Sequence, residues 1–248
     1  MSELSLPQQL WGETLDKLVN SLQLTEVLGD GGGPYMSLQS QAPFASGEVG
    51  NVRVFKGDHI HQVVTCSLVV PAIHLDSHML FAFMPPESPV PHFTLDSVSG
   101  GEHFAFHLDL IPRVDLGAHL DYMDAVFTPL TELLKTGRAV EGLSPAQLDP
   151  RQYAVMSPWM FVSRATADAF QQIHNIVDGY LDHWLTLVGQ GVSPAALGGA
   201  DAQQLAERDQ RNKAIIFDPN VDKVWNQIQG LIGEQACLEL RNLLKASS

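Results

Sequence analysis

The sequence predicts an α+β fold in which helices flank a central antiparallel sheet. Runs of β-branched and aromatic residues fill much of residues 35–112, whereas residues 4–28 and 113–248 place apolar side chains at helical spacing. The breaks between the β-rich runs are too short to hold crossover helices, so neighbouring strands should be antiparallel. Strands grouped together, rather than alternating with helices, are typical of α+β proteins.

The first half of the chain predicts one helix followed by a strand meander. Leu10, Leu15, Leu18 and Leu22 repeat at helical spacing within residues 4–28, and the glycine-rich run at 29–34 ends that helix. Gly-Asp, proline-rich and Gly-Gly breaks then separate the β-rich runs. The predicted strands cover residues 52–55, 60–70, 78–84, 92–98 and 103–110.

The second half predicts helices that cover the sheet. The predicted helices cover residues 120–135, 166–188, 201–212, 221–232 and 234–245, and residues 160–163 predict one more strand. We expect residues 1–248 to form a single domain. It comprises an N-terminal helix and glycine loop (1–34), a sheet-rich part (35–112) and a mainly helical part (113–248).

Composition excludes several classes of function. Of the 248 residues, 45% are hydrophobic and 17% charged, which is typical of a globular protein. The net charge of −14 argues against broad nucleic-acid binding and against adhesion to anionic membranes. Cys66 and Cys237 form neither a disulfide framework nor a CxxC metal site. With no signal-peptide pattern and no apolar run of about 18 residues, we expect a soluble cytoplasmic protein.

The stretch from residue 91 to residue 122 is the most informative part of the chain. Its second strand alternates His103, Ala105, His107 and Asp109 with apolar residues, so these four should share one face of the sheet. Asp96 lies in the middle of the preceding strand. Polar groups on a sheet face are costly to bury unless something polar uses them. The pattern therefore indicates a ligand-binding or catalytic face.

Four segments resemble a known family. They are LDLIPRVDL with DYMD (108–124), PWMFVSRA (158–165), RDQRNKAIIFDPNVDKVW (208–225) and LIGEQACLELRNLL (231–244). In this order and spacing they resemble the red chlorophyll catabolite reductases, which belong with the ferredoxin-dependent bilin reductases. The resemblance covers roughly residues 45–245.

The resemblance implies an α/β/α sandwich that reduces an open-chain tetrapyrrole, either biliverdin or red chlorophyll catabolite. Such enzymes hold no cofactor of their own. Reduced ferredoxin supplies single electrons, and protein carboxyls and water supply protons through a bound radical. We expect ferredoxin as a partner. The substrate, the double bond reduced, the number of electrons and the choice between monomer and homodimer stay open.

The resemblance also assigns three catalytic candidates. Asp96 occupies the position of a family Asp that works in proton transfer. For the second acid, the register of the phycocyanobilin-forming enzymes points to Asp222, whereas the chlorophyll-catabolite branch points to Asp218. From the local sequence alone, Asp218 reads as the N-cap of a helix that starts with Pro219. Asp222 would then lie about one turn into that helix.

Five further residues are candidates for substrate binding. Arg164 and Arg113 follow strands and are suited to bind propionate carboxylates in a bidentate manner. Lys223 matches a basic family position beside the second acid. His78 lies in the window of a histidine that is essential in phycocyanobilin-forming enzymes, without a clean register. His107 belongs to the polar strand face.

The electron donor and the alternatives complete the expectations. Ferredoxins are acidic, so docking would need a locally basic surface, for which we consider the following residues: Arg53, Lys56, Arg208, Arg211, Lys213 and Lys223. One alternative is a non-catalytic bilin carrier. The other is a metal-dependent enzyme that uses the pairs His59/His61 or His103/His107, although the expected metal content is none.

Overall fold

An antiparallel sheet runs through the whole protein. The computed structural model describes residues 4–246, in which nine strands pair in the order β1-β3-β4-β5-β6-β7-β9-β8, with β2 also paired to β3. Residues 1–3 and 247–248 of the predicted domain lie outside the described residues. The strands are β1 (Thr25–Val27), β2 (Met36–Gln39), β3 (Glu48–Gly57), β4 (Ile60–Val70), β5 (Leu75–Phe83), β6 (His92–Gly100), β7 (His103–Ile111), β8 (Leu143–Pro145) and β9 (Phe161–Ala165).

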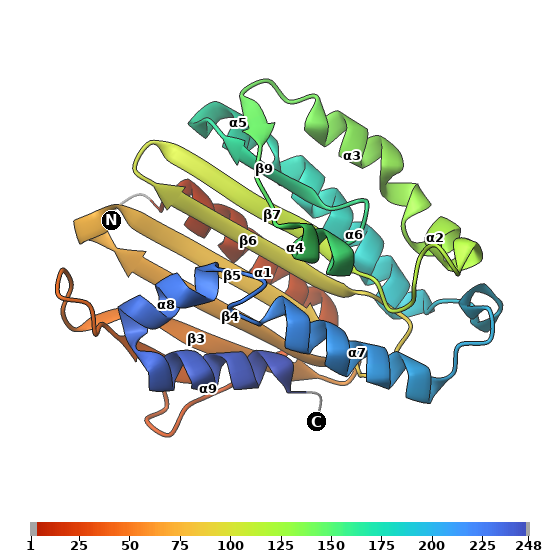
Figure 1. The fold of residues 1–248 in the computed structure, drawn as a ribbon, viewed down its shortest axis with the longest axis horizontal. Coiled ribbons are helices and arrows are strands. Elements are labelled where there is room, and N and C mark those ends of the chain that lie inside the picture. Colours follow the sequence, from red (N-terminus) through yellow and green to blue (C-terminus); the bar gives the residue numbers. More distant parts are fainter. Residues whose placement is uncertain (1–3, 247–248) are drawn as a thin grey trace.

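Helices cover both faces of the sheet and form an α/β/α sandwich. Figure 1 shows three C-terminal helices across the near face and α1 behind the sheet. The far-face helices are α1 (Leu6–Leu22), α2 (Leu120–Val126), α3 (Thr131–Arg138), α5 (Ala167–Gln172) and α6 (His174–Gln190). The near-face helices are α7 (Ala202–Ile216), α8 (Val224–Ile232) and α9 (Glu234–Lys245), and α4 (Pro150–Val155) precedes β9. The predicted fold class is confirmed.

Several predicted helices end or break earlier than their periodicity suggests. The first helix stops at Leu22 because Gln23 adopts a left-handed conformation (φ 51°) and its N–H bonds to the Val19 carbonyl. The predicted helix over 120–135 is split by a turn at Pro129, whose nitrogen has no hydrogen to donate. The one over 166–188 is divided between α5 and α6, and the helix α4 was missed.

Alternation along the strands separates the two faces of the sheet as expected. Phe106 and Leu108 of β7 enter the core beneath α1 and α6. His107 points to the other face, where its neighbour across the β6–β7 ladder is Asp96. Asp96 in turn pairs with Met79 of β5, which belongs to the core beneath α8 and α9. The polar strand face therefore lies under the C-terminal helices.

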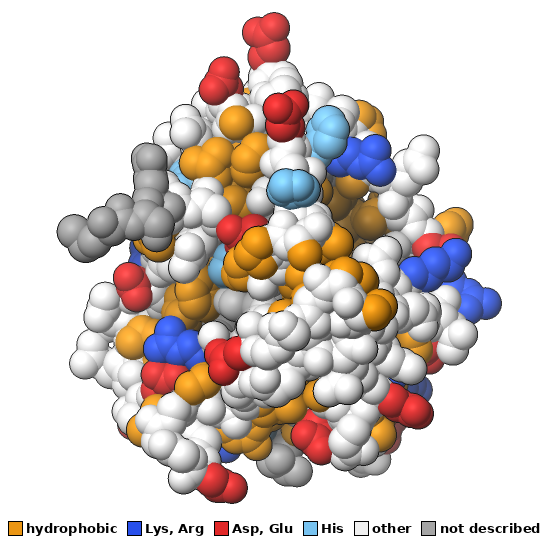
Figure 2. All heavy atoms as spheres, turned by 90° about the vertical axis from the view of Figure 1, so that its left-hand side faces the viewer, with side chains coloured by type: hydrophobic (Ala, Val, Ile, Leu, Met, Phe, Trp, Pro, Cys, Tyr) orange, Lys and Arg blue, Asp and Glu red, His pale blue; other side chains and the backbone are white. Residues whose placement is uncertain are grey.

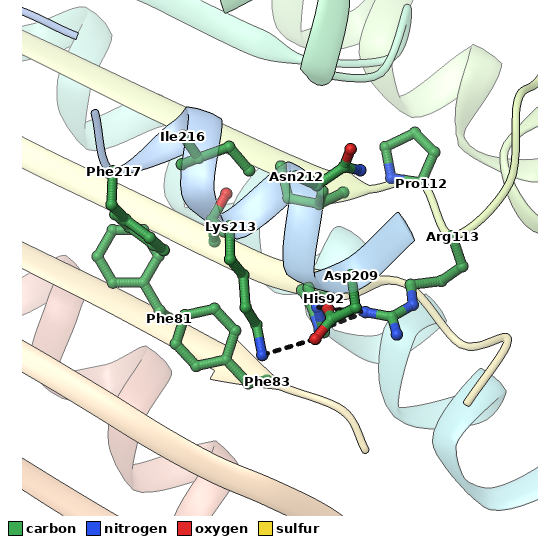
Figure 3. Close-up of a pocket in the computed structure, with 12 residues that line it drawn as sticks. Phe81, Phe83, His92, Pro112, Arg113, Asp209, Asn212, Lys213, Ile216 and Phe217 are labelled. Carbon is green, nitrogen blue, oxygen red and sulfur yellow. Dashed lines mark hydrogen bonds and ion pairs between the residues drawn. The ribbon is translucent and has the colours of Figure 1, made fainter. Parts of the chain in front are cut away.

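A buried ion cluster attaches α7 to the sheet (Figure 3). The carboxylate of Asp209 in α7 accepts hydrogen bonds from His92 Nε2 at 2.6 Å, from Arg113 Nη1 at 2.6 Å and from Lys213 Nζ at 3.0 Å. All four side chains are nearly fully buried. His92 Nδ1 accepts the Met84 N–H at 3.0 Å, so Nε2 carries the ring proton and donates it to Asp209. Burial, followed by the neighbouring Arg113 charge, lowers the pKa of His92 to about 3, so the ring is neutral.

The cluster also joins α7 to two segments at the edge of the strands. Burial alone would raise the pKa of Asp209, but the bond from His92 and the charges of Arg113 and Lys213 hold it well below its usual range. Arg113 also donates to the Pro86 carbonyl at 2.6 Å and the Ser88 carbonyl at 3.1 Å. The segment between β5 and β6, the chain after β7 and the helix α7 are thereby held together.

We predict that Asp209→Asn destabilises the protein by about 3–5 kcal/mol, because it removes a buried carboxylate that faces the buried charges of Arg113 and Lys213. Urea unfolding at pH 7 measures this loss. The pKa of Asp209 is lower in the folded than in the unfolded protein. Its contribution to the free energy of unfolding is therefore fully present above the ordinary carboxyl pKa and is lost as the pH falls toward the folded-state pKa. Glu207→Gln, which alters an exposed pair with Arg211, should change stability by less than about 0.5 kcal/mol. Equal effects of the two variants would contradict the assignment.

Candidate functional site

A cavity of about 710 Å³ lies between the polar face of the sheet and the C-terminal helices. Its walls are mainly apolar side chains of β5, of α8 and of the turn that follows α7. Phe44, Ile73 and Val224 line it while being 49%, 46% and 37% exposed, so they mark its mouth. Figure 2 shows the side of the molecule that lies on the left in Figure 1, where hydrophobic side chains gather in patches between acidic and histidine side chains. Its size is in the range of small-molecule sites.

Asp96 and His107 are cross-strand neighbours on the cavity floor. Asp96 Oδ2 lies 3.8 Å from His107 Nδ1, and the two side chains are 37% and 17% exposed. Burial would lower the pKa of His107, but Asp96, followed by Asp109 and Asp222, raises it. Asp96 Oδ1 and His107 Nε2 are buried without a hydrogen-bond partner. Unsatisfied polar atoms in a native core are uncommon, and here they lie beside a cavity.

Asp222 reaches the cavity from the turn between α7 and α8. Its Oδ1 accepts the Val224 N–H at 3.0 Å, which gives a partner to the first N–H of α8, whose N-cap residue is Lys223. Burial raises the pKa of Asp222, and the charge of Asp96 adds to this effect. A carboxyl whose proton affinity is raised by burial and by a second carboxylate can hold its proton at a higher pH than a carboxyl in water.

Asp218, the competing candidate, does not line the cavity. Its Oδ1 accepts from the Asn220 N–H at 2.7 Å and from Asn220 Nδ2 at 3.0 Å, which closes a turn at the surface. The backbone bond from Asn220 is the main reason why the pKa of Asp218 is lowered. The predicted helix start at Pro219 is wrong, because α8 begins at Val224, and the side chain that accepts the first N–H of α8 is Asp222 rather than Asp218. The structure thus brings Asp222 to the cavity.

His78 lies on the opposite face of the sheet. Its Nδ1 contacts Ser67 Oγ at 2.8 Å, its Nε2 contacts Asp76 Oδ1 at 2.6 Å, and its ring stacks on Trp11 of α1. Burial lowers the pKa of His78. The register explains its position, because β5 places Met79 beside Asp96, and a neighbouring residue on a strand points to the other face.

The basic candidates lie outside the cavity wall. Arg113 is committed to the buried cluster with Asp209, and Lys213 is buried there too, so Lys213 is not an accessible docking residue. Arg164 is exposed on the cavity side of the sheet, in the row that also contains Val98 and Ala105. Lys223 is exposed beside Asp222. Arg164 and Lys223 are therefore placed near the mouth rather than inside.

The other candidate residues for ferredoxin docking differ in their exposure and in the partners that they already have. Arg53 is already held by Glu26 through two bonds of 2.8 Å. Arg208 is half-buried, and burial lowers the pKa of its guanidinium. Arg211 and Lys56 are exposed. In the part of the chain that the structure describes, no group of three His, Cys, Asp or Glu side chains could hold a metal ion.

Asp109 is a residue of the site that the sequence did not single out as a candidate. It is fully buried on the same strand face as His107 and accepts from Ser157 N–H at 2.8 Å, Ser157 Oγ at 2.5 Å and Leu110 N–H at 2.9 Å. Burial raises the pKa of Asp109 to about 6, against the charge of His107 and these bonds, which lower it. The strand alternation had placed it beside His107, which was the available signal.

Comparisons with known proteins identify similarities in sequence and in fold. A scan of protein-family models finds no match to this chain. Red chlorophyll catabolite reductase of Hordeum vulgare is 26% identical over 170 residues, covering 60% of this chain and 80% of that protein. The chain is similar to this reductase. The crystal structure of phytochromobilin synthase from tomato, in complex with biliverdin, matches with a TM-score of 0.76 at 18% identity.

The resemblance found in the motifs is therefore confirmed. The match to the tomato enzyme covers 96% of this chain and 83% of that chain, so the two proteins share their fold. Within the described residues, no helix is both long and apolar enough to span a membrane.

We predict that Asp222→Asn strongly reduces turnover without lowering the melting temperature. The amide can still accept the Val224 N–H, but unlike the carboxyl it cannot take up and release a proton. Because burial raises the pKa of Asp222, its ionisation in the folded state costs stability above that pKa, and a neutral amide removes this cost. Calorimetry at pH 8 should show an equal or slightly higher melting temperature.

Asp218 provides the matched control. Asp218→Asn should keep full activity, and Asp218→Ala should destabilise by no more than about 1 kcal/mol, because only the exposed turn loses its side-chain acceptor for the Asn220 N–H. An inactive Asp218→Asn beside an active Asp222→Asn would reverse the assignment.

Proposed function

We propose that this protein is a ferredoxin-dependent reductase of an open-chain tetrapyrrole, biliverdin or red chlorophyll catabolite. One observation carries the proposal. Asp96, His107 and Asp222, which come from two strands and the turn before a helix, converge on a single and mainly apolar cavity. The names of the related proteins, a red chlorophyll catabolite reductase and a phytochromobilin synthase in complex with biliverdin, support it.

The cavity suits a large flat ligand with polar nitrogens. Aromatic and aliphatic walls such as Phe81, Trp225 and Leu231 would cover the conjugated rings. The carboxyls of Asp96 and Asp222 can hydrogen-bond to pyrrole N–H groups. None of the described residues that line the cavity is Lys or Arg, so acidic tails would be oriented toward the mouth, where Arg164 and Lys223 are exposed.

The chemistry assigned to the chain is proton delivery. Reducing one double bond adds two electrons and two protons, and reduced ferredoxin would supply the electrons one at a time. Asp96 and Asp222 would each give a proton to the ligand as it becomes more basic on reduction. Burial raises the pKa of Asp222, which keeps a proton available to it at a higher pH than a carboxyl in water would allow. The apolar walls keep water from competing for the reduced ligand.

We predict that the purified protein binds biliverdin near one-to-one with a change in the red region of the absorption spectrum. Under anaerobic conditions, reduced ferredoxin should then convert the complex to a product with a shorter conjugated system. A spectral change on binding without any product would instead identify a carrier protein. No spectral change at micromolar concentrations, with either biliverdin or red chlorophyll catabolite, would remove the bilin hypothesis.

Asp96→Asn should retain ligand binding and lose turnover by about 10²–10⁴-fold, which is the usual contribution of a positioned proton donor. The amide has nearly the same size as the carboxyl, so packing in the cavity is kept. Single-turnover spectra with reduced ferredoxin measure the loss and show whether a partly reduced intermediate accumulates. Glu102→Gln, an exposed acid in the turn between β6 and β7, is the control and should behave as the parent protein. Normal turnover in Asp96→Asn would make Asp96 a structural residue.

A further inference from the structure

A third carboxylate lies beneath the proton-donating pair. Asp109 follows His107 by two residues on β7, so both side chains project from the same face of the sheet. His107 is at the cavity wall, whereas Asp109 is fully buried and does not line the cavity. Asp109 therefore cannot contact a ligand in the cavity, and any influence on chemistry would pass through His107.

The hydrogen bonds of Asp109 are those of a carboxylate. Three donors surround it, the Ser157 N–H, the Ser157 hydroxyl and the Leu110 N–H. The Ser157 hydroxyl itself receives the Trp159 N–H at 3.1 Å, which leaves its own proton directed at Asp109. A fold that surrounds a fully buried acid only with donors favours its charged form.

The charges around His107 match a protonated imidazole. Asp96 faces it from β6, Asp109 from its own strand and Asp222 from the turn before α8. Its partner on β9 is Val162, which carries no charge. In the proposed reaction Asp96 and Asp222 lose their protons to the ligand and later regain them, so their negative charge varies during turnover. Asp109 is isolated from the ligand, so its charge can persist.

We propose that Asp109 is a positioning residue of the proposed reductase, a buried carboxylate that keeps His107 protonated so that His107 can return a proton to Asp96. This inference rests on the proposed function. Asp96 gives its proton to the ligand and becomes a carboxylate, and the proton on His107 Nδ1 passes to it across the 3.8 Å gap, which must shorten in the complex. Neutral His107 then regains a proton from water at the cavity mouth. Each electron that enters the ligand is matched by one proton that leaves this chain.

The test begins with the ligand-free protein, so that it does not depend on bilin turnover. Nitrogen-15 NMR of labelled histidines gives the titration of each ring, and the His107 signal is identified by its absence in His107→Gln. In the parent protein His107 should titrate above an ordinary histidine. In Asp109→Asn its pKa should fall, because the persistent negative charge is gone. An unchanged or higher pKa of His107 would overturn the proposal.

The chain offers a matched control. Asp76 also lies two residues from a histidine of its own strand, β5, and it contacts that histidine, His78, on the opposite face of the sheet. Asp76→Asn should shift the titration of His78 and leave His107 and turnover unchanged. A shift of His107 in this variant equal to that in Asp109→Asn would show a general effect of lost charge and would also overturn the proposal.

Ser157→Ala keeps the test decisive if Asp109→Asn does not fold. It removes one donor to Asp109 while keeping the acid, so the pKa of Asp109, raised by burial to about 6, should rise further. When Asp109 ionises, the chemical shift of His107 should change by a small amount, and in Ser157→Ala this change should occur at higher pH. The absence of this change in both the parent protein and Ser157→Ala would mean that the two residues are not coupled.

Turnover supplies the functional readout. With reduced ferredoxin and bilin, Asp109→Asn should lose at least about tenfold in turnover at pH 7.5 with unchanged bilin affinity, and the alkaline limb of its pH profile should lie at lower pH. Parent-like turnover and pH profile in this variant would overturn the role in proton return. If the parent protein itself reduces no bilin, the proposed function fails, while the titrations still decide whether Asp109 controls His107.

Discussion

The attachment of α7 to the sheet through Asp209 is the constraint on which the cavity depends. Buried ion pairs often add little net stability, but removing one partner is strongly unfavourable, so such a cluster allows few alternative arrangements. Here Asp209 is held between His92 of β6, Arg113 after β7 and Lys213 one helical turn further along α7. Because α7 is fixed, the turn that follows it is fixed too. That turn carries Phe217 and Asp222, which close the cavity over the polar strands.

The cavity in turn explains why the sheet carries polar groups where an apolar core would be more stable. The far face of β6 and β7 is filled by Leu95, Phe106 and Leu108 beneath α1 and α6. On the near face, Asp96 Oδ1 and His107 Nε2 have no hydrogen-bond partner. Such groups cost free energy in the folded protein. Their presence beside a cavity is understandable if a ligand supplies the missing partners.

The sequence predicted the sheet well because alternation is a local signal. The strand over 60–70 has the predicted bounds, and the face shared by His107 and Asp109 follows from period-two alternation alone. Pairing between strands is not local. His78 was placed near the site, yet β5 aligns Met79 with Asp96, and a shift of one residue turns His78 to the other face. The burial of Arg113 depends on Asp209, 96 residues away in the chain, which no local pattern reveals. The choice between Asp218 and Asp222 likewise required the position at which α8 begins.

The charges around the cavity also determine how ligand binding would change the protonation of the nearby acids. Three acids, Asp96, Asp109 and Asp222, surround one imidazole, so the empty site carries excess negative charge when all are ionised. An apolar ligand that displaces water lowers the local polarity and makes this excess more costly, which favours protonation of the acids nearest to the ligand. Asp109, surrounded by donors behind the wall, is the acid least affected by this change. Ligand entry would then further favour the protonated form of Asp222. A site in which acids lie close together beside apolar walls is thus suited to the proposed ligand, which would receive protons together with electrons.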